Sequence, residues 1–272
     1  MTAAGFAPEW LALRERADAE ARAAELLGPL RESLPASRLV IRDLGCGTGS
    51  MGRWLAGRLD RPQHWVLHDR DPRLLALAEA ALATEDVTVE TRRAELAGLR
   101  AADLAGTSLV TASALLDLVS AGWVDALARR CLDARATALF ALTYDGRMSF
   151  EPREADDEAV AALVNRHQLG DKGFGPALGP AAGERARETF AELGFNVATA
   201  RSEWRVDADA GELQAALLDG WRAAAREIAP ECADALERWA AARHAHVAAG
   251  RSTLTVGHVD LLAWLAGGSR ES

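Results

Sequence analysis

Several residue types are scarce in this chain, and each shortage excludes a class of protein. Among 272 residues there is a single lysine, Lys172, and there are three cysteines, Cys46, Cys131 and Cys232. The cysteines are far apart and odd in number, so they predict neither a disulfide framework nor a cysteine-rich metal site. No apolar run approaches the roughly 18 to 20 residues of a membrane span, and the first residues lack the pattern of a secretory leader. We therefore expect a cytoplasmic protein without a membrane partner.

Positive charge is also scarce. Lys and Arg total 31 against 40 Asp and Glu, which gives a net charge of −9. Proteins that bind nucleic acid need a positive surface for the phosphates, so the balance predicts no nucleic-acid partner. No group of His, Cys, Asp and Glu has the spacing of a metal site, and none is expected. The remaining expectation is a small-molecule substrate, handled by a monomer or a homodimer.

The apolar pattern alternates between strand and helix periods. Short apolar runs at 38–44, 63–68, 87–91, 108–112 and 136–144 are separated by helical patterns. This rhythm is typical of βαβ units and predicts an α/β fold with a doubly wound, mostly parallel sheet. Further strands at 195–206 and 252–258 bring the expected sheet to seven strands, with helices on both faces. A short helix is predicted to follow and to end near Leu265.

The rhythm is interrupted in two places, which predicts helical cap insertions around the α/β core. Segment 145–180 is rich in Gly, Pro and charge and is too long for a plain loop. We therefore expect four regions along the chain: an N-terminal helical cap at 1–36, the α/β core at 37–148, a substrate lid at 149–180, and the end of the core sheet at 181–272 with a helical insertion at about 207–251.

A predicted helix over 8–27 carries a stripe of Trp10, Arg14, Asp18 and Arg22, each four residues from the next. Residues four apart share a helix face. Either this face is solvated, or the helix lies over a site with its charges pointing inward. On the second hypothesis Arg14 would lie at the site.

The most informative stretch is the glycine-rich loop DLGCGTG, from Asp43 to Gly49. It follows the first strand and opens a helix, where glycines let backbone N–H groups approach a ligand. The second strand ends at Asp69, which could accept hydrogen bonds from ribose hydroxyls. Gly47 and the glycines after it also match a dinucleotide fingerprint, which keeps an NAD(P)-dependent oxidoreductase as an alternative. A carboxylate at Asp43, however, would repel a pyrophosphate and suits a cationic ligand.

The stretch VIRDLGCGTGS resembles the first motif of the class I S-adenosylmethionine-dependent methyltransferases. The segments VLHDRDP, RRAEL, SLVTASALLDLV, AELGFNVATA and STLTVGH resemble the family's later motifs in the same order. The resemblance spans roughly 38–265. It implies a Rossmann-like fold, S-adenosyl-L-methionine as the methyl donor and S-adenosyl-L-homocysteine as the product. A non-catalytic protein that binds S-adenosylmethionine stays a second alternative.

The resemblance also implies the residues that hold the cofactor. Asp43 and the loop glycines would surround the methionine part, Asp69 the ribose, Glu95 the adenine, and Ser113 would form the floor beneath the methyl donor. Arg14 would lie near the methionine carboxylate. The Glu at position 95 departs from the commoner Asp. The complete predicted set is Arg14, Asp43, Gly45, Gly47, Gly49, Asp69, Arg70, Glu95, Leu96 and Ser113.

The methyl acceptor is less well defined. The sequence has neither the Asn/Asp-Pro-Pro-aromatic motif of nucleic-acid amino methylases nor the Pro-Cys pair of the cytosine-C5 type, which favours a polar small molecule. Segment 165–172 concentrates residue types that are rare in this chain. It is either an ordinary polar loop or a substrate lid. We expect catalytic roles for His167, Lys172 and Tyr144, with His167 as the base. The expected substrate-binding residues are Asn165, Arg166, Gln168, Phe174 and Asp117. The acceptor atom, oxygen, nitrogen or carbon, stays open.

Overall fold

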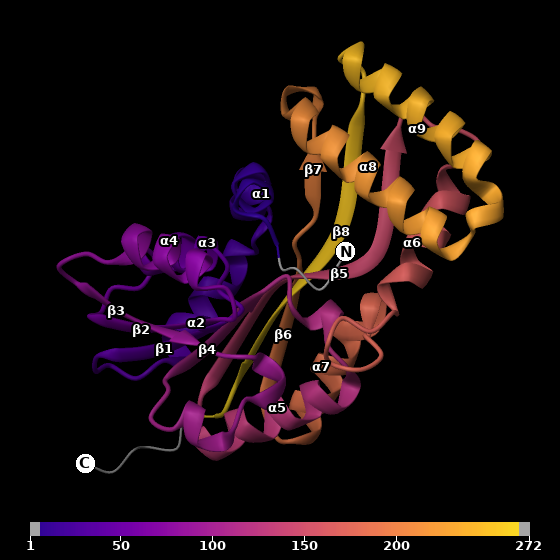
Figure 1. Cartoon of the computed structure of the whole chain (residues 1–272). Helices are drawn as coiled ribbons and strands as arrows, with labels where there is room; N and C mark the ends of the chain where they lie inside the picture. Colours follow the sequence, from indigo (N-terminus) through magenta and orange to yellow (C-terminus); the bar gives the residue numbers. More distant parts are fainter. Residues whose placement is uncertain (1–5, 267–272) are drawn as a thin grey trace.

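One large mixed sheet forms the centre of the molecule (Figure 1). This computed structural model describes residues 6–266. Within that range eight strands form the sheet in the order β3-β2-β1-β4-β5-β8-β6, and β7 pairs with β8. The strands are β1 Leu39–Leu44, β2 Gln63–Asp69, β3 Val87–Arg93, β4 Leu109–Ser113, β5 Thr137–Glu151, β6 Asn196–Arg201, β7 Trp204–Val206 and β8 Thr253–Trp264.

The strand directions confirm the predicted fold class. Strands β1 to β5 pair in parallel, and β8 runs antiparallel to β5, β6 and β7. The sheet has one strand more than predicted, because segment 195–206 divides into β6 and β7. The two strands pair with different parts of β8, and the Ser202 amide between them donates to the carbonyl of His258.

Two predicted boundaries near the sheet were wrong. No helix ends near Leu265; instead β8 continues to Trp264. Its second half lies between β5 and β6 and is buried, so its apolar run is that of a central strand. The fifth strand does not stop at Tyr144 either, since β5 continues to Glu151 alongside the first half of β8.

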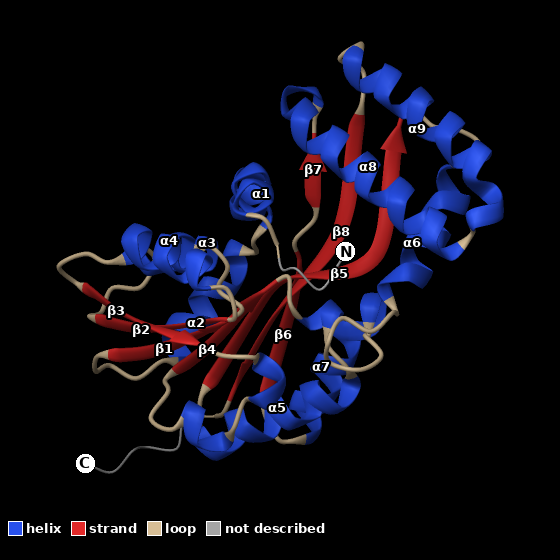
Figure 2. Cartoon of the chain, in the orientation of Figure 1, coloured by secondary structure: helices blue, strands red, loops and turns tan. Residues whose placement is uncertain are grey.

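Helices cover both faces of the parallel part of the sheet (Figure 2). Buried residues of α2, α3 and α4 pack in one core cluster, and those of α5 and α7 in the other. The helices are α1 Pro8–Ala21, α2 Leu27–Ser33, α3 Ser50–Ala56, α4 Pro72–Leu82, α5 Ala121–Ala134, α6 Asp157–Gln168, α7 Ala182–Glu192, α8 Gly211–Ile228 and α9 Ala233–Ala248. Short 3₁₀ turns are η1 Ala24–Leu26, η2 Leu96–Gly98, η3 Ala101–Leu104, η4 Leu116–Leu118, η5 Gly179–Ala181, η6 Ala208–Ala210 and η7 Pro230–Cys232.

The end of β5, the start of β8 and β7 extend beyond the parallel strands, and α6, α8 and α9 lie beside them (Figure 1). A buried ion pair joins this helical layer. Arg243 of α9 donates from Nε to Asp157 at 3.0 Å, and Trp239 donates to the same carboxylate at 2.9 Å. Arg243 also donates to the carbonyl of Pro152 at 2.7 Å. The layer is thus fixed to the chain that follows β5.

The predicted helix over 8–27 is shorter than expected. Helix α1 ends at Ala21, and Arg22 has an extended backbone. Among the described residues no helix is both long and apolar enough to span a membrane. The predicted regions 1–36 and 181–272 begin and end outside the described part of the chain, and the division into four regions stays a prediction.

Candidate functional site

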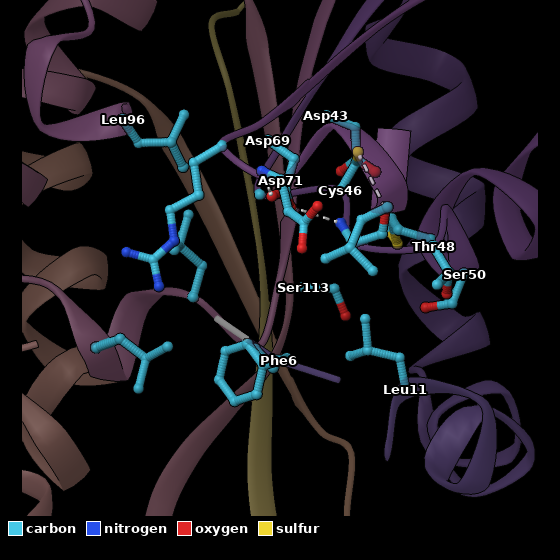
Figure 3. A pocket seen from close by; sticks show the side chains of 18 of the residues that line it. Phe6, Leu11, Asp43, Cys46, Thr48, Ser50, Asp69, Asp71, Leu96 and Ser113 are labelled. Carbon is cyan, nitrogen blue, oxygen red and sulfur yellow. Dashed lines mark hydrogen bonds between the residues drawn. The ribbon is translucent and has the colours of Figure 1, made fainter. Parts of the chain in front are cut away.

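A cavity of about 510 Å³ opens at the carboxyl ends of β1, β2, β3 and β4. Helix α1 and the loop at 171–174 complete its wall. Figure 3 shows the acidic side chains of Asp69 and Asp71 on one side of this space and Phe6 and Leu11 on another, with Ser113 between them. Carboxyl ends of parallel strands are where α/β sheets bind ligands, so the position agrees with the fold.

The glycine loop forms the part of the wall between β1 and α3. Gly45, Gly47 and Gly49 have φ values of +70°, +54° and +85°, which side chains rarely adopt. A Cβ on Gly47 would also lie 3.1 Å from a methyl group of Leu11 in α1. Gly45 and Gly47 line the cavity, whereas Gly49 precedes α3 and contacts Ala78 of α4. The third glycine therefore shapes the loop rather than the cavity surface.

Asp43 is the buried carboxylate of the site. It is 1% exposed, and one oxygen accepts a hydrogen bond from the Thr111 hydroxyl at 2.8 Å. The other oxygen is buried and has no partner among residues 6–266. Burial raises the pKa of Asp43 to about 6, while Thr111 and the nearby Arg22 act in the opposite direction. A buried acceptor of this kind is satisfied when a donor, and best a cation, enters the cavity.

Asp69 links the second strand to the glycine loop. Its carboxylate accepts from the amide of Gly47 at 3.0 Å and from the amide of Asp71 at 2.9 Å. Asp71 caps α4 by accepting from the amide of Arg73, and the Arg73 guanidinium donates to the same carboxylate. The side-chain hydrogen bond, followed by the amide, lowers the pKa of Asp71 to about 2. The proline at the start of α4 predicts this capping role. Asp69 also lines the cavity, but its carboxylate does not cap a helix.

The charged stripe of α1 does point inward. Arg14 lines the cavity, donates to Asp18 at 3.0 Å and stacks 4.7 Å from the ring of Trp204. Arg22 is 3% exposed and donates to the hydroxyls of Ser50 at 2.9 Å and Ser113 at 3.2 Å.

Two nitrogens of Arg22, Nε and Nη1, are buried and find no partner in the described part of the chain, and burial lowers the pKa of this guanidinium. The predicted site set does not include Arg22, Ser50 or Thr111. The stripe itself was the signal for Arg22. Nothing in the local sequence marks the two hydroxyls.

Four residues of the predicted substrate lid line the cavity: Asp171, Lys172, Gly173 and Phe174. The Lys172 ammonium donates to the carbonyl of His167 at 3.2 Å, and the ring of Phe174 meets that of Trp123 edge-on at 5.7 Å. The Asp171 carboxylate accepts from the amides of Gly173 at 2.7 Å and Gly175 at 3.0 Å, which holds the loop in shape.

The other predicted acceptor-site residues lie away from the cavity surface. His167 contacts Glu227 of α8 at 2.9 Å. The Tyr144 hydroxyl donates to Asn165 at 2.7 Å, and burial raises the pKa of Tyr144. Asn165 in turn donates to the carbonyl of Gly146 at 3.0 Å. Arg166, Gln168 and Asp117 are also absent from the cavity lining.

Asp117 is nevertheless unusual. It is 6% exposed, its Oδ1 atom is buried without a partner, and burial raises its pKa to about 6. Backbone hydrogen bonds and the charges of Arg14 and Lys172 act in the opposite direction. Asp117 belongs to the same 3₁₀ turn as Leu118, which lines the cavity.

Residues 41–135 match the family model of a methyltransferase domain. This segment is a methyltransferase domain. It contains the glycine loop, Asp69, Glu95 and Ser113, so the resemblance to a methyltransferase is confirmed for this segment. No curated protein sequence matches the chain.

Solved structures of similar shape include a cyclopropane synthase from Mycobacterium tuberculosis, 13% identical over 88% of this chain and 83% of that one, with a TM-score of 0.45. Another is an S-adenosylmethionine-dependent methyltransferase from Geobacter sulfurreducens in complex with S-adenosyl-L-homocysteine. It is 18% identical over 94% of this chain and 98% of that one, with a TM-score of 0.44. At these sequence identities and TM-scores, the structural similarities give no information about the substrate.

Proposed function

We propose that this methyltransferase domain transfers the methyl group of S-adenosylmethionine to a polar small molecule in the cavity beside the glycine loop. The observation that carries the proposal is the unpartnered, buried carboxylate oxygen of Asp43 at the end of β1. It suits the positive charge of S-adenosylmethionine and would repel the pyrophosphate of a nicotinamide cofactor. The same charge argument disfavours the oxidoreductase alternative.

The remaining lining residues fit the other parts of this cofactor. Arg22 does not itself line the cavity, but its Nη2 atom donates to the lining hydroxyls of Ser50 and Ser113. Within residues 6–266 its Nε and Nη1 atoms have no partner, and we assign the methionine carboxylate to this guanidinium together with Arg14. Asp69 keeps acceptor capacity for ribose hydroxyls after its two amide bonds. Glu95 and Leu96 follow β3 and would face the adenine.

When bound, S-adenosylmethionine supplies an electrophilic methyl group attached to a sulfonium. The chain's own residues then have to orient the acceptor and exclude water. Orientation contributes about 7 to 11 kcal/mol to such reactions, against about 3 to 5 kcal/mol for a positioned base. Phe174, Leu115 and Leu118 provide an apolar surface for that purpose.

The contacts of the three predicted catalytic residues distinguish their roles. Lys172 lines the cavity, whereas the His167 ring contacts Glu227 and the Tyr144 hydroxyl contacts Asn165. We therefore propose Lys172 as the residue that touches the acceptor. His167 and Tyr144 are proposed to position the loop and the end of β5. A small-molecule acceptor, a monomeric or homodimeric state and a cytoplasmic location stay predictions.

Transfer of a labelled methyl group tests the proposal. The protein is incubated with S-adenosylmethionine carrying a tritiated methyl group and with a broad small-molecule extract, in parallel with Asp69→Ala. We expect label in a small-molecule fraction and a strong reduction with the variant. Binding of the cofactor product without any transfer would instead support a non-catalytic binding protein and contradict the proposal.

A further inference from the structure

The cations of the cavity differ in whether they already have a partner. Arg14, Arg70 and Lys172 line it. Arg14 makes three hydrogen bonds to Asp18, so its charge is largely compensated. Arg70 follows Asp69 at the end of β2 and belongs to the proposed ribose side of the site. Lys172 is the lysine that contributes a compact ammonium to this surface.

Lys172 makes no ion pair within residues 6–266, although its charge acts on the carboxyl groups of Asp117 and Glu227. Its Nζ atom donates to the carbonyl of His167 at 3.2 Å. Asp171 is adjacent in sequence, but its carboxylate is turned to the amides of Gly173 and Gly175. A partly buried ammonium without a carboxylate loses solvation energy that a bound anion can restore.

The surroundings of Lys172 indicate the shape of that anion. Its loop packs on the segment after β4: Phe174 meets Trp123, and the amide of Leu178 donates to the carbonyl of Val119. The cavity wall contributed by that segment is apolar, with Leu115 and Leu118. An occupant of this end would therefore contact one cation and several apolar side chains.

We propose that the methyl acceptor is a carboxylic acid with an apolar body, and that the Lys172 ammonium binds its carboxylate while Phe174 and Leu118 contact the body. A carboxylate is favoured over a phosphate because a dianion is normally met by several donors, such as an arginine fork or a helix N-terminus. This inference rests on the proposed function, since it names the substrate class for the same cavity.

The test uses matched pairs of acids and amides. Benzoate with benzamide, phenylacetate with phenylacetamide, and isovalerate with isovaleramide are titrated by ligand-observed NMR into the protein saturated with S-adenosylhomocysteine. We expect at least one acid to bind about tenfold more tightly than its amide. In Lys172→Gln this preference should fall to about threefold or less. Arg153→Gln, which removes an exposed positive charge after β5, should keep it.

The outcomes separate the two proposals. Equal binding of acids and amides, no binding of any acid, or an acid preference that survives in Lys172→Gln would overturn the inference and leave the methyltransferase proposal intact. A Lys172→Gln protein that loses affinity for S-adenosylhomocysteine would place the lysine at the cofactor and also overturn it. A lower thermal midpoint with unchanged acid preference would show a structural role instead. If wild-type protein does not bind S-adenosylhomocysteine, the proposed function itself fails.

Discussion

The two sides of the cavity are built in different ways. The cofactor side comes mainly from consecutive strand ends, between Asp43 and Ser113, within the segment that matches the methyltransferase domain. The proposed acceptor side combines Leu115 and Leu118, after β4, with the loop at 171–174, which comes from a distant part of the chain. The first side depends on local loop chemistry, whereas the second depends on how distant elements pack. A change in one side should therefore leave the other largely intact.

The largest expected effect lies in the helical layer that supports the acceptor side. Arg243→Met leaves the buried Asp157 carboxylate without its cation, which typically lowers the free energy of unfolding by about 3 to 5 kcal/mol. Urea denaturation measures this loss. The affinity of the folded fraction for S-adenosylhomocysteine should stay unchanged, because the layer does not line the cofactor side.

The double variant Asp157→Asn/Arg243→Met is the control for that experiment. It removes the buried charge together with its partner, so it should recover part of the lost stability. A double variant no more stable than Arg243→Met would show that the ion pair is not the cause.

The second effect concerns the cofactor side. Asp69→Ala should reduce the affinity for S-adenosylhomocysteine by about 1.5 to 3 kcal/mol, because buried hydroxyls lose a charged acceptor. Isothermal titration calorimetry measures it. Asp71→Ala is the matched control: it removes the cap of α4 and should cost about 1 kcal/mol of stability with little change in affinity. If Asp71→Ala lost affinity and Asp69→Ala did not, Asp71 rather than Asp69 would be the carboxylate that binds the cofactor.

A pH dependence follows from Asp43. Its pKa is raised from 3.8 to about 6 by burial, so the folded protein holds this proton more tightly than the unfolded chain. Asp43 therefore contributes stability at low pH, and that contribution is lost as the pH rises from about 4 through about 6.

Binding of cationic S-adenosylmethionine should change in the opposite sense, since it favours the ionised form. We expect roughly tenfold tighter binding at pH 7.5 than at pH 5. Asp43→Asn should make binding nearly independent of pH over this range. Asp117, whose pKa is also about 6, is still present in this variant, so a flat profile assigns the titration to Asp43. An unchanged profile in Asp43→Asn would assign the titration to another group.

The smallest effect tests how firmly α1 holds the cavity. Glu15 of α1 forms a two-point ion pair with Arg53 of α3, at 2.7 and 2.6 Å, but both side chains are partly exposed. Glu15→Gln should therefore change stability by about 1 kcal/mol or less, and cofactor affinity by a similarly small amount. A large loss of affinity with an unchanged thermal midpoint would show that this ion pair is specifically required to hold α1 in place for cofactor binding.

The same contrast explains which parts of the site the sequence predicted. Gly45 and Gly47 lie in the short loop after β1, and Asp69 is the last residue of β2. At such strand ends residue order nearly determines position, and all three residues line the cavity. Thr111 and Ser50 reach the site only through the pairing of β1 with β4 and the turn of Arg22 out of α1. Local patterns do not encode such contacts.

Segment 165–172 shows the limit most clearly. Its rare polar residues were expected to face one substrate, but α6 continues to Gln168 and distributes them around a helix. Asn165 therefore faces Tyr144, and His167 faces α8. Lys172, in the loop beyond the helix, reaches the cavity. Because α6 includes residues 165–168, side chains that are adjacent in the sequence point in different directions.

Titration of the wild-type protein with S-adenosylhomocysteine, followed by the same titration with NAD⁺, tests the central claim most directly. The account predicts saturable binding of one S-adenosylhomocysteine per chain and no heat of binding with NAD⁺, because the buried Asp43 carboxylate would face a pyrophosphate. Saturable binding of NAD⁺ without binding of S-adenosylhomocysteine, by a protein with an intact thermal transition, would contradict it.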